Sequence, residues 1–85
     1  MRPNDQNKEF LALDQVEVGT SARLSTISPQ LSDKLATRLM ALGFVPGTEV
    51  KVMRRAPLGD PIEFEVRGGR ISLRRSEARH LFTTG

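Results

Sequence analysis

Alternation of apolar and polar residues predicts a chain built mainly of short β-strands. Between Ile62 and Val66 every second side chain is apolar, and Phe64 stands between two glutamates. Because successive side chains of a strand point to opposite faces, this segment is expected to bury one face and expose the other. The same pattern, less regular in the first segment, predicts strands at 20–27, 49–55, 62–67, 70–74 and 81–83.

One segment has the spacing of a helix. Leu35, Leu39 and Leu42 recur every three or four residues, which places them on a single face. Ser32 precedes them as the expected N-cap, and Gly43 follows as the expected left-handed stop. The sequence therefore predicts an amphipathic helix between these two residues, with its leucine stripe on the core.

Turn and cap residues separate the elements. Gly68 and Gly69 are expected to form the two-residue turn of a hairpin, since glycine accepts positive φ. Asp14 and Ser76 are expected to cap single helical turns, the second of which places Ala78 on the core.

Five short strands are too few for a large open sheet, so the predicted fold class is mainly β, a small closed or nearly closed barrel. Closure also removes the strand edges that promote aggregation. One α-helix is expected after the first strand, together with short helical turns. Residues 1–9 lack a hydrophobic period and are expected to form a flexible N-terminal tail, whereas 10–85 form a single domain.

The composition fits one small cytoplasmic domain. A chain of 85 residues has room for a single core, and without cysteine it has neither disulfides nor thiolate ligands, as suits a reducing compartment. No apolar stretch approaches the ~20 residues of a membrane-spanning helix. No insertion into a membrane is therefore expected.

The inventory of reactive side chains argues against catalysis. His80 is the only histidine and there is no cysteine, so neither a nucleophile with its base nor a zinc or ferrous site can be assembled. His80 itself is expected to be a surface or partly buried side chain near the last strand. We expect no enzyme, no catalytic residue, no cofactor, no metal site and no small-molecule substrate.

The formal charge of +3 leaves a small basic nucleic-acid-binding barrel as an alternative. Residues 51–85 hold eight basic and four acidic side chains, a net charge of +4 for that part. Proteins that bind single strands also need exposed aromatic side chains, and Phe64 is predicted to face the core. Nucleic acid is therefore not the expected partner.

The segment Ala56–Pro61 is a candidate interaction loop. Its two prolines stiffen it, and they place the apolar Leu58 near its tip. A stiff loop loses little conformational entropy when it docks on a partner. The alternative, in which Leu58 folds back over the rim of the barrel, fits the sequence equally well.

Three motifs, LGFVPG at 42–47, RRAPLGDPI at 54–62 and ISLRRSEA at 71–78, have the order and spacing of the FeoA family of ferrous iron transport proteins. The chain resembles this family over about residues 10–83. The resemblance implies an SH3-like barrel and a cytosolic, non-enzymatic accessory of FeoB, the membrane transporter of Fe(II), acting through protein–protein interaction with its cytosolic region. A related module forms the C-terminal domain of metal-dependent transcription repressors, so a metal-dependent regulatory domain is the alternative.

Carried onto this sequence, the resemblance suggests a partner-facing loop and an adjoining apolar groove at the end of the helix. The expected partner-binding residues are Pro57, Leu58, Gly59, Asp60 and Pro61 in the loop, and Leu39, Leu42 and Phe44 in the groove. The sequence departs from the family pattern at Gly69, where a bulky residue is usual, and at Thr83, where an aliphatic residue is usual. We therefore expect a more flexible hairpin and a less firmly paired last strand.

Overall fold

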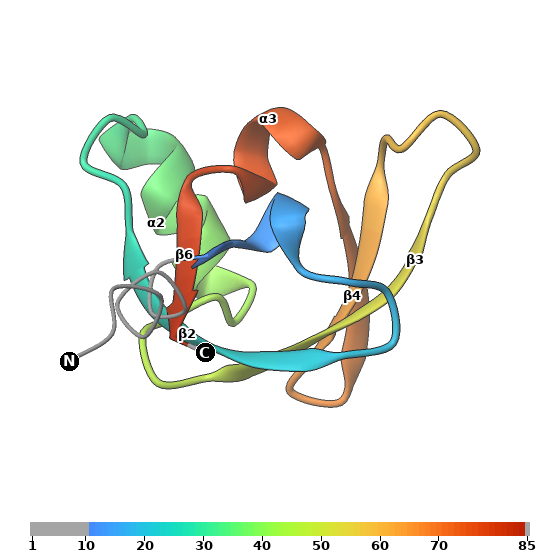
Figure 1. The fold of residues 1–85 in the computed structure, drawn as a ribbon. Coiled ribbons are helices and arrows are strands. Elements are labelled where there is room, and N and C mark those ends of the chain that lie inside the picture. Colours follow the sequence, from blue (N-terminus) through green and yellow to red (C-terminus); the bar gives the residue numbers. More distant parts are fainter. Residues whose placement is uncertain (1–10, 85) are drawn as a thin grey trace, which may run out of the picture.

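The computed structural model describes residues 11–84, which form a strongly curved antiparallel sheet with two helices (Figure 1). The sheet has six strands in the order β1-β6-β2-β3-β4-β5. In chain order the elements are β1 (Leu11–Ala12), the 3-10 turn η2 (Leu13–Gln15), β2 (Ser21–Ile27), α2 (Asp33–Ala41), β3 (Glu49–Arg55), β4 (Ile62–Val66), β5 (Gly69–Leu73), α3 (Arg75–Ala78) and β6 (Leu81–Thr84). The predicted tail 1–9 lies outside the described residues.

The predicted strands and the mainly β fold class are found, with one strand more than expected. The additional strand is β1, whose two residues, Leu11 and Ala12, pair with Thr83 and Phe82 of β6. Two residues carry no alternation that a pattern search can detect, so only the pairing defines this strand. As a result α2 follows the second strand and not the first.

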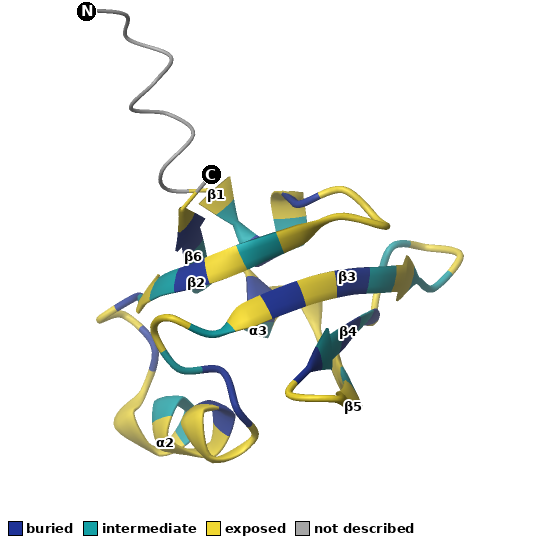
Figure 2. Cartoon of the chain, turned by 90° about the horizontal axis from the view of Figure 1, so that it is seen from below, coloured by how far each residue is buried: buried dark blue, intermediate teal, exposed yellow. Residues whose placement is uncertain are grey.

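The alternating strands supply most of the core. Ile62 and Phe64 of β4 are fully buried, and Val66 is nearly so. Val50 and Val52 on the neighbouring strand β3 are also fully buried. Figure 2 shows this as buried positions separated by exposed ones along β3. The period-two pattern thus predicted the inward face of both strands correctly.

The helix begins as predicted but buries a narrower stripe. The Ser32 hydroxyl accepts a hydrogen bond of 3.2 Å from the Leu35 amide, which caps the N-terminus. Gly43 has a φ of +114°, the left-handed conformation expected of a helix stop. Leu39 is 1% exposed but Leu42 is 39% exposed, because α2 ends one residue before Leu42.

The β4–β5 turn is displaced by one residue from its predicted position. Its central residues are Arg67 and Gly68, with φ of 53° and 79°, and Val66 pairs with Gly69. A turn at Gly68 and Gly69 would have paired Arg67 with Arg70. The observed register instead places Arg70 opposite Glu65, which replaces a like-charge pair with an opposite-charge pair.

The predicted capping residues of the short helical turns are wrong. No side chain caps η2, which follows Ala12. At α3 the N-cap is Arg74 and not Ser76, and the Arg74 amide donates to a Glu77 carboxylate oxygen at 3.0 Å. Ala78 is buried, as predicted.

The expectation of a loosely paired last strand is not supported at Thr83. This residue is 1% exposed, and its hydroxyl donates a hydrogen bond of 2.8 Å to the Leu11 carbonyl. A threonine can replace an aliphatic residue here because its hydroxyl is satisfied by β1. The side chain therefore adds a link between β6 and β1.

Candidate functional site

The loop between β3 and β4 is closed by its own backbone. Arg55 and Ile62 are the last pair of the ladder, and the Ala56 amide donates to the Pro61 carbonyl at 3.0 Å. Within the loop, the Gly59 amide donates to the Ala56 carbonyl at 2.7 Å. Gly59 has a φ of +87°, a conformation that other residues adopt with strain. These two hydrogen bonds fix the loop as a compact turn.

Leu58 lies at the tip of this loop and is 94% exposed. The alternative in which it folds back over the barrel is therefore wrong. Figure 1 shows the loop projecting from the sheet on the far side from α2. An exposed leucine forgoes about 1.5–3 kcal/mol of burial free energy, which a partner that covers it can recover.

Asp60 links the loop to the start of α3. A carboxylate oxygen of Asp60 accepts a hydrogen bond of 3.0 Å from the Arg75 amide, at the start of α3. The first amides of a helix lack partners within the helix, so this acceptor satisfies one of them. Asp60 thus positions the loop through an internal contact.

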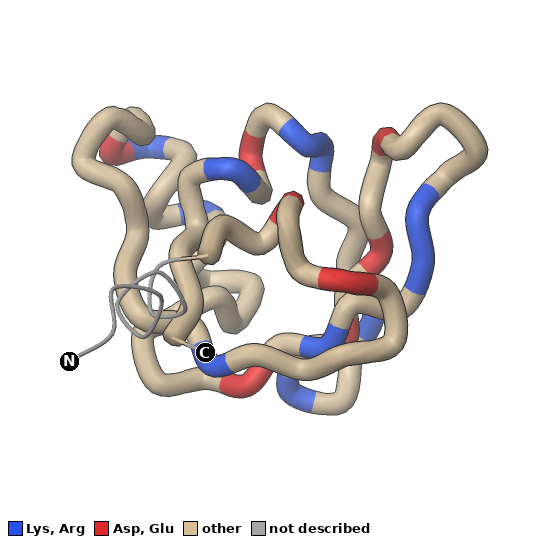
Figure 3. Tube along the Cα trace, viewed as in Figure 1, with Lys and Arg blue, Asp and Glu red and all other residues tan. Residues whose placement is uncertain are grey.

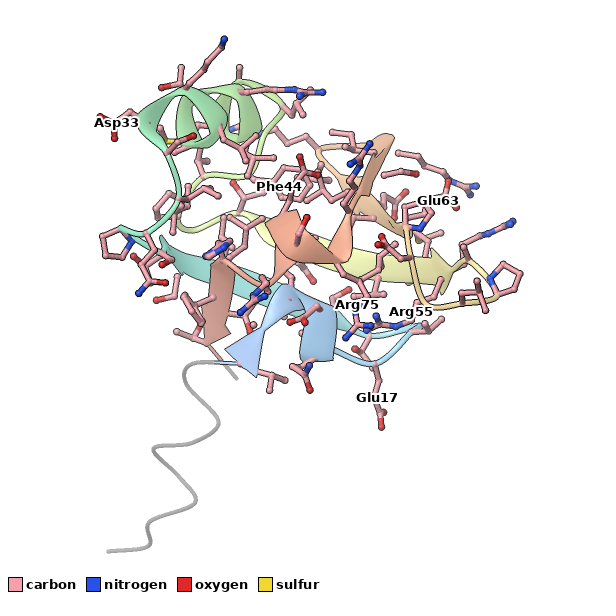
Figure 4. All side chains as sticks on the ribbon, turned by 90° about the horizontal axis from the view of Figure 1, so that it is seen from above. Glu17, Asp33, Phe44, Arg55, Glu63 and Arg75 are labelled. Atoms are coloured by element: carbon pink, nitrogen blue, oxygen red, sulfur yellow. The ribbon has the colours of Figure 1, made fainter. Side chains whose placement is uncertain are left out.

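Arg55 anchors the base of the loop from the other side. Its guanidinium Nη2 donates to the carbonyl oxygens of Asp14, at 2.8 Å, and of Val16, at 3.0 Å. Figure 4 shows Arg55 beside the segment that contains Glu17. Two hydrogen bonds to carbonyls more than 35 residues away in the chain link the end of β3 to the η2 turn.

A β-bulge places Arg55 in this position. The register between β3 and β4 shifts between Val52 and Arg54, so Arg54 lies opposite Glu63 and Arg55 opposite the buried Ile62. A bulge re-aims the side chains that follow it. The exposed Arg54 lies 3.7 Å from the half-buried Glu63 as an ion pair, while Arg55 is half-buried. The pattern analysis missed this role, because regular alternation would have put Arg54 and not Arg55 on the inward side.

The residues predicted at the helix end do not form a groove beside the loop. Phe44 is 0% and Leu39 1% exposed, and the Phe44 ring packs edge-on against Phe64 with ring centroids 6.0 Å apart. Figure 4 shows Phe44 between α2 and the sheet. Of the three predicted groove residues only Leu42 reaches the surface, where Met40 is exposed with it. α2 and the loop lie at opposite sides, with α3 between them (Figure 1).

The remaining candidate chemistry is sparse in residues 11–84. Within that range no three His, Cys, Asp or Glu side chains are grouped so that they could hold a metal ion. His80 is half-buried, and its carbonyl accepts a hydrogen bond from the Ser28 amide. No helix in the described range is long and apolar enough to cross a membrane. Phe44 and Phe64 are core residues and offer no stacking surface to a nucleic acid.

Residues 11–84 match the family model described as FeoA domain. A FeoA-like protein from Clostridium acetobutylicum is 35% identical, with a TM-score of 0.78 over 88% of this chain and 85% of that one. FeoA from Chlorobium tepidum is 35% identical, with a TM-score of 0.80 over 87% of this chain and 69% of that one. The chain belongs to the FeoA domain family, and the resemblance noted from its motifs is confirmed.

Two further similarities bear on the fold. A zinc complex of Stenotrophomonas maltophilia FeoA, described as an SH3 domain protein, is 32% identical, with a TM-score of 0.76 over 86% of this chain and 88% of that one. The predicted SH3-like fold is thereby confirmed. A manganese-dependent transcriptional repressor has a TM-score of 0.80 over 89% of this chain and 41% of that one, but at 13% identity this likeness shows the fold alone. The family consists of non-enzymatic factors of ferrous iron transport, which agrees with the prediction of no enzyme.

Proposed function

From its membership in the FeoA domain family, we propose that the protein is a cytoplasmic accessory of Fe(II) uptake that binds the cytosolic region of a FeoB-type transporter. It acts through surface contact and without catalysis. The observation that carries this proposal is Leu58, which is 94% exposed at the tip of the β3–β4 loop. An apolar side chain in that position gains free energy only when another molecule covers it.

The internal hydrogen bonds of the loop support the same role. The loop is closed by its backbone, joined to α3 through Asp60 and supported at its base by Arg55. A loop that is already ordered loses little entropy on binding, so more of the free energy of covering Leu58 appears as affinity.

The loop is tested by titrating the transporter's isolated cytosolic region with the unchanged protein and with four variants, each changed at one side chain. We expect Leu58→Asp to weaken binding at least about tenfold, because it replaces apolar contact with a charge that must lose water. Leu58→Met keeps the apolar tip and is expected to bind within about threefold of the unchanged protein. Leu11→Asp introduces the same charge at another exposed leucine, 42% exposed and on β1, and serves as the matched control.

Leu42→Asp, the fourth variant, asks whether the exposed part of the helix end shares in binding. Equal affinity of Leu58→Asp and the unchanged protein contradicts the proposed role of the loop. Loss of binding by Leu42→Asp alone would assign the contact to α2. Failure of all variants and of the unchanged protein to bind would remove the transporter as the partner.

A further inference from the structure

Among residues 11–84, no strand pairs with the outer edge of β5. This strand stands at the end of the strand order and pairs with β4. Val66 and Gly69 close the two-residue hairpin, so hydrogen-bonded pairs recur at every second position from there. The amides and carbonyls of Arg70 and Ser72 therefore point away from β4. Within the described residues, none of these four groups forms another backbone hydrogen bond.

A hollow of about 590 Å³ adjoins this edge, between β5 and α2. Leu35 and Arg38 of α2 line one side, and Ser72 of β5 with Arg74, the N-cap of α3, line the other. Leu35 is half-buried, so it offers an apolar surface, whereas Ser72 is exposed on the outer face of the strand. The hollow thus combines an apolar wall, unpaired backbone groups and two guanidinium groups.

The segment that forms the edge is basic, although the neighbouring strand β4 places Glu63 and Glu65 opposite Ser72 and Arg70. From Arg67 to Arg75 the chain contains four arginines and no acidic residue. Arg70 lies 4.0 Å from Glu63, but Arg38 and Arg74 form no ion pair with a described residue. Figure 3 shows basic positions on α2 and on the segment that leads into α3.

The acidic residue that lines this hollow, Glu77, already accepts a hydrogen bond. Its carboxylate accepts this bond from the Arg74 amide at 3.0 Å. Within residues 11–84 no carboxylate forms an ion pair with the Arg38 or Arg74 guanidinium, so both can interact with a bound molecule.

We propose that the β5 edge accepts an extended acidic segment of a partner protein as a seventh strand. The backbone of that segment would pair with Arg70 and Ser72, and its carboxylates would lie near Arg38 and Arg74. A second copy of this chain is disfavoured, because pairing two β5 edges would bring the same arginines together. The proposal deepens the proposed function by describing the chemistry of a second contact, separate from Leu58.

The test is an NMR titration of the full chain with a capped seven-residue peptide that alternates Thr and Glu. We expect the largest shifts at the amides of Arg70 and Ser72, and hydrogen exchange of these two amides slowed at least about tenfold at saturation. A peptide that alternates Thr and Lys is the matched control and is expected to cause neither change.

Two kinds of variant separate strand addition from general charge attraction. Ser72→Pro removes an amide that the sheet does not use, so the fold tolerates it at an edge, and peptide affinity is expected to fall at least about tenfold. Ser72→Thr keeps the amide and is expected to bind normally. If Ser72→Pro fails to fold, slowed exchange of the Arg70 and Ser72 amides decides strand addition. Arg38→Glu with Arg74→Glu then tests the carboxylate contact: about a fivefold loss is expected, against no loss for Lys51→Glu on β3.

Three outcomes would overturn the proposal. The first is equal binding of the acidic peptide by Ser72→Pro, which would leave only general charge attraction. The second is no binding of the peptide by the unchanged protein, which would leave the arginines as protection of the edge against aggregation. The third is protection of the Arg70 and Ser72 amides that grows with protein concentration without peptide, which would indicate a second copy. Leu58→Asp is expected to keep peptide binding, so failure of the transporter contact and failure of this inference are distinguishable.

Discussion

Two regions carry the apolar residues that the sequence marks as partner-facing, and the structure treats them in opposite ways. At the end of α2, Leu39 and Phe44 point into the core, whereas at the β3–β4 loop Leu58 points into solvent. Both regions contain leucine beside glycine and proline, so their compositions do not separate them. The difference shows that an apolar residue is available to a partner only when the backbone that carries it holds it facing outward.

The largest loss of stability is expected at the buried end of α2. Phe44→Ala should lower the free energy of unfolding by about 3–5 kcal/mol, because it removes a fully buried ring that packs against Phe64. Urea denaturation measures the loss. Leu42→Ala, two positions away and 39% exposed, is the matched control and should lose much less. Similar losses for the two variants would mean that Phe44 does not occupy the core.

An intermediate effect is expected at the base of the loop. Arg55→Met keeps the aliphatic stem but removes the donors to the carbonyls of Asp14 and Val16, so stability should fall by about 1–3 kcal/mol. Arg54→Met removes the exposed partner of Glu63 and should change stability by about 1 kcal/mol or less. Denaturation of both variants provides the comparison. If Arg54→Met is the more damaging change, the assignment of the bulge is incorrect.

The smallest effect is expected where the loop meets α3. Asp60→Ala removes the acceptor of the Arg75 amide and should lower stability by about 0.5–2 kcal/mol. Asp60→Asn retains an oxygen acceptor and should recover most of that loss. Hydrogen exchange at the Arg75 amide, faster in the alanine variant alone, reports the contact directly. Unchanged exchange in both variants would show that Asp60 does not hold the loop.

Much of the fold could be predicted because it depends on short-range patterns. The alternation at 62–66 and the Ser32 to Gly43 helix signals each identified an element and its inward face. The two-residue strand β1 and the one-residue shift of the β4–β5 turn were missed. Both depend on which residue lies opposite which across the sheet, and that information is spread over distant parts of the chain.

The candidate site was predicted in part for the same reason. The loop and its apolar tip follow from prolines, glycine and leucine in a row, but the exposure of Leu58 is set by the packing around it. Arg55 was missed because the bulge in β3 reverses the faces of the residues after it. The position of β5 at the edge of the described sheet follows from the strand order, which no local pattern contains.

The sequence by itself determined the class of protein: a small cysteine-free β domain with one capped helix, a stiff loop and the motifs of the FeoA family. Composition, periodicity and turn chemistry are local properties, and they suffice for those conclusions. Only the tertiary structure decided that Leu58 faces outward while Phe44 faces inward, and that Arg55 reaches Asp14 and Val16. Those outcomes depend on pairing register and on packing between segments far apart in the chain, so they are fixed only when the sheet curves around its core.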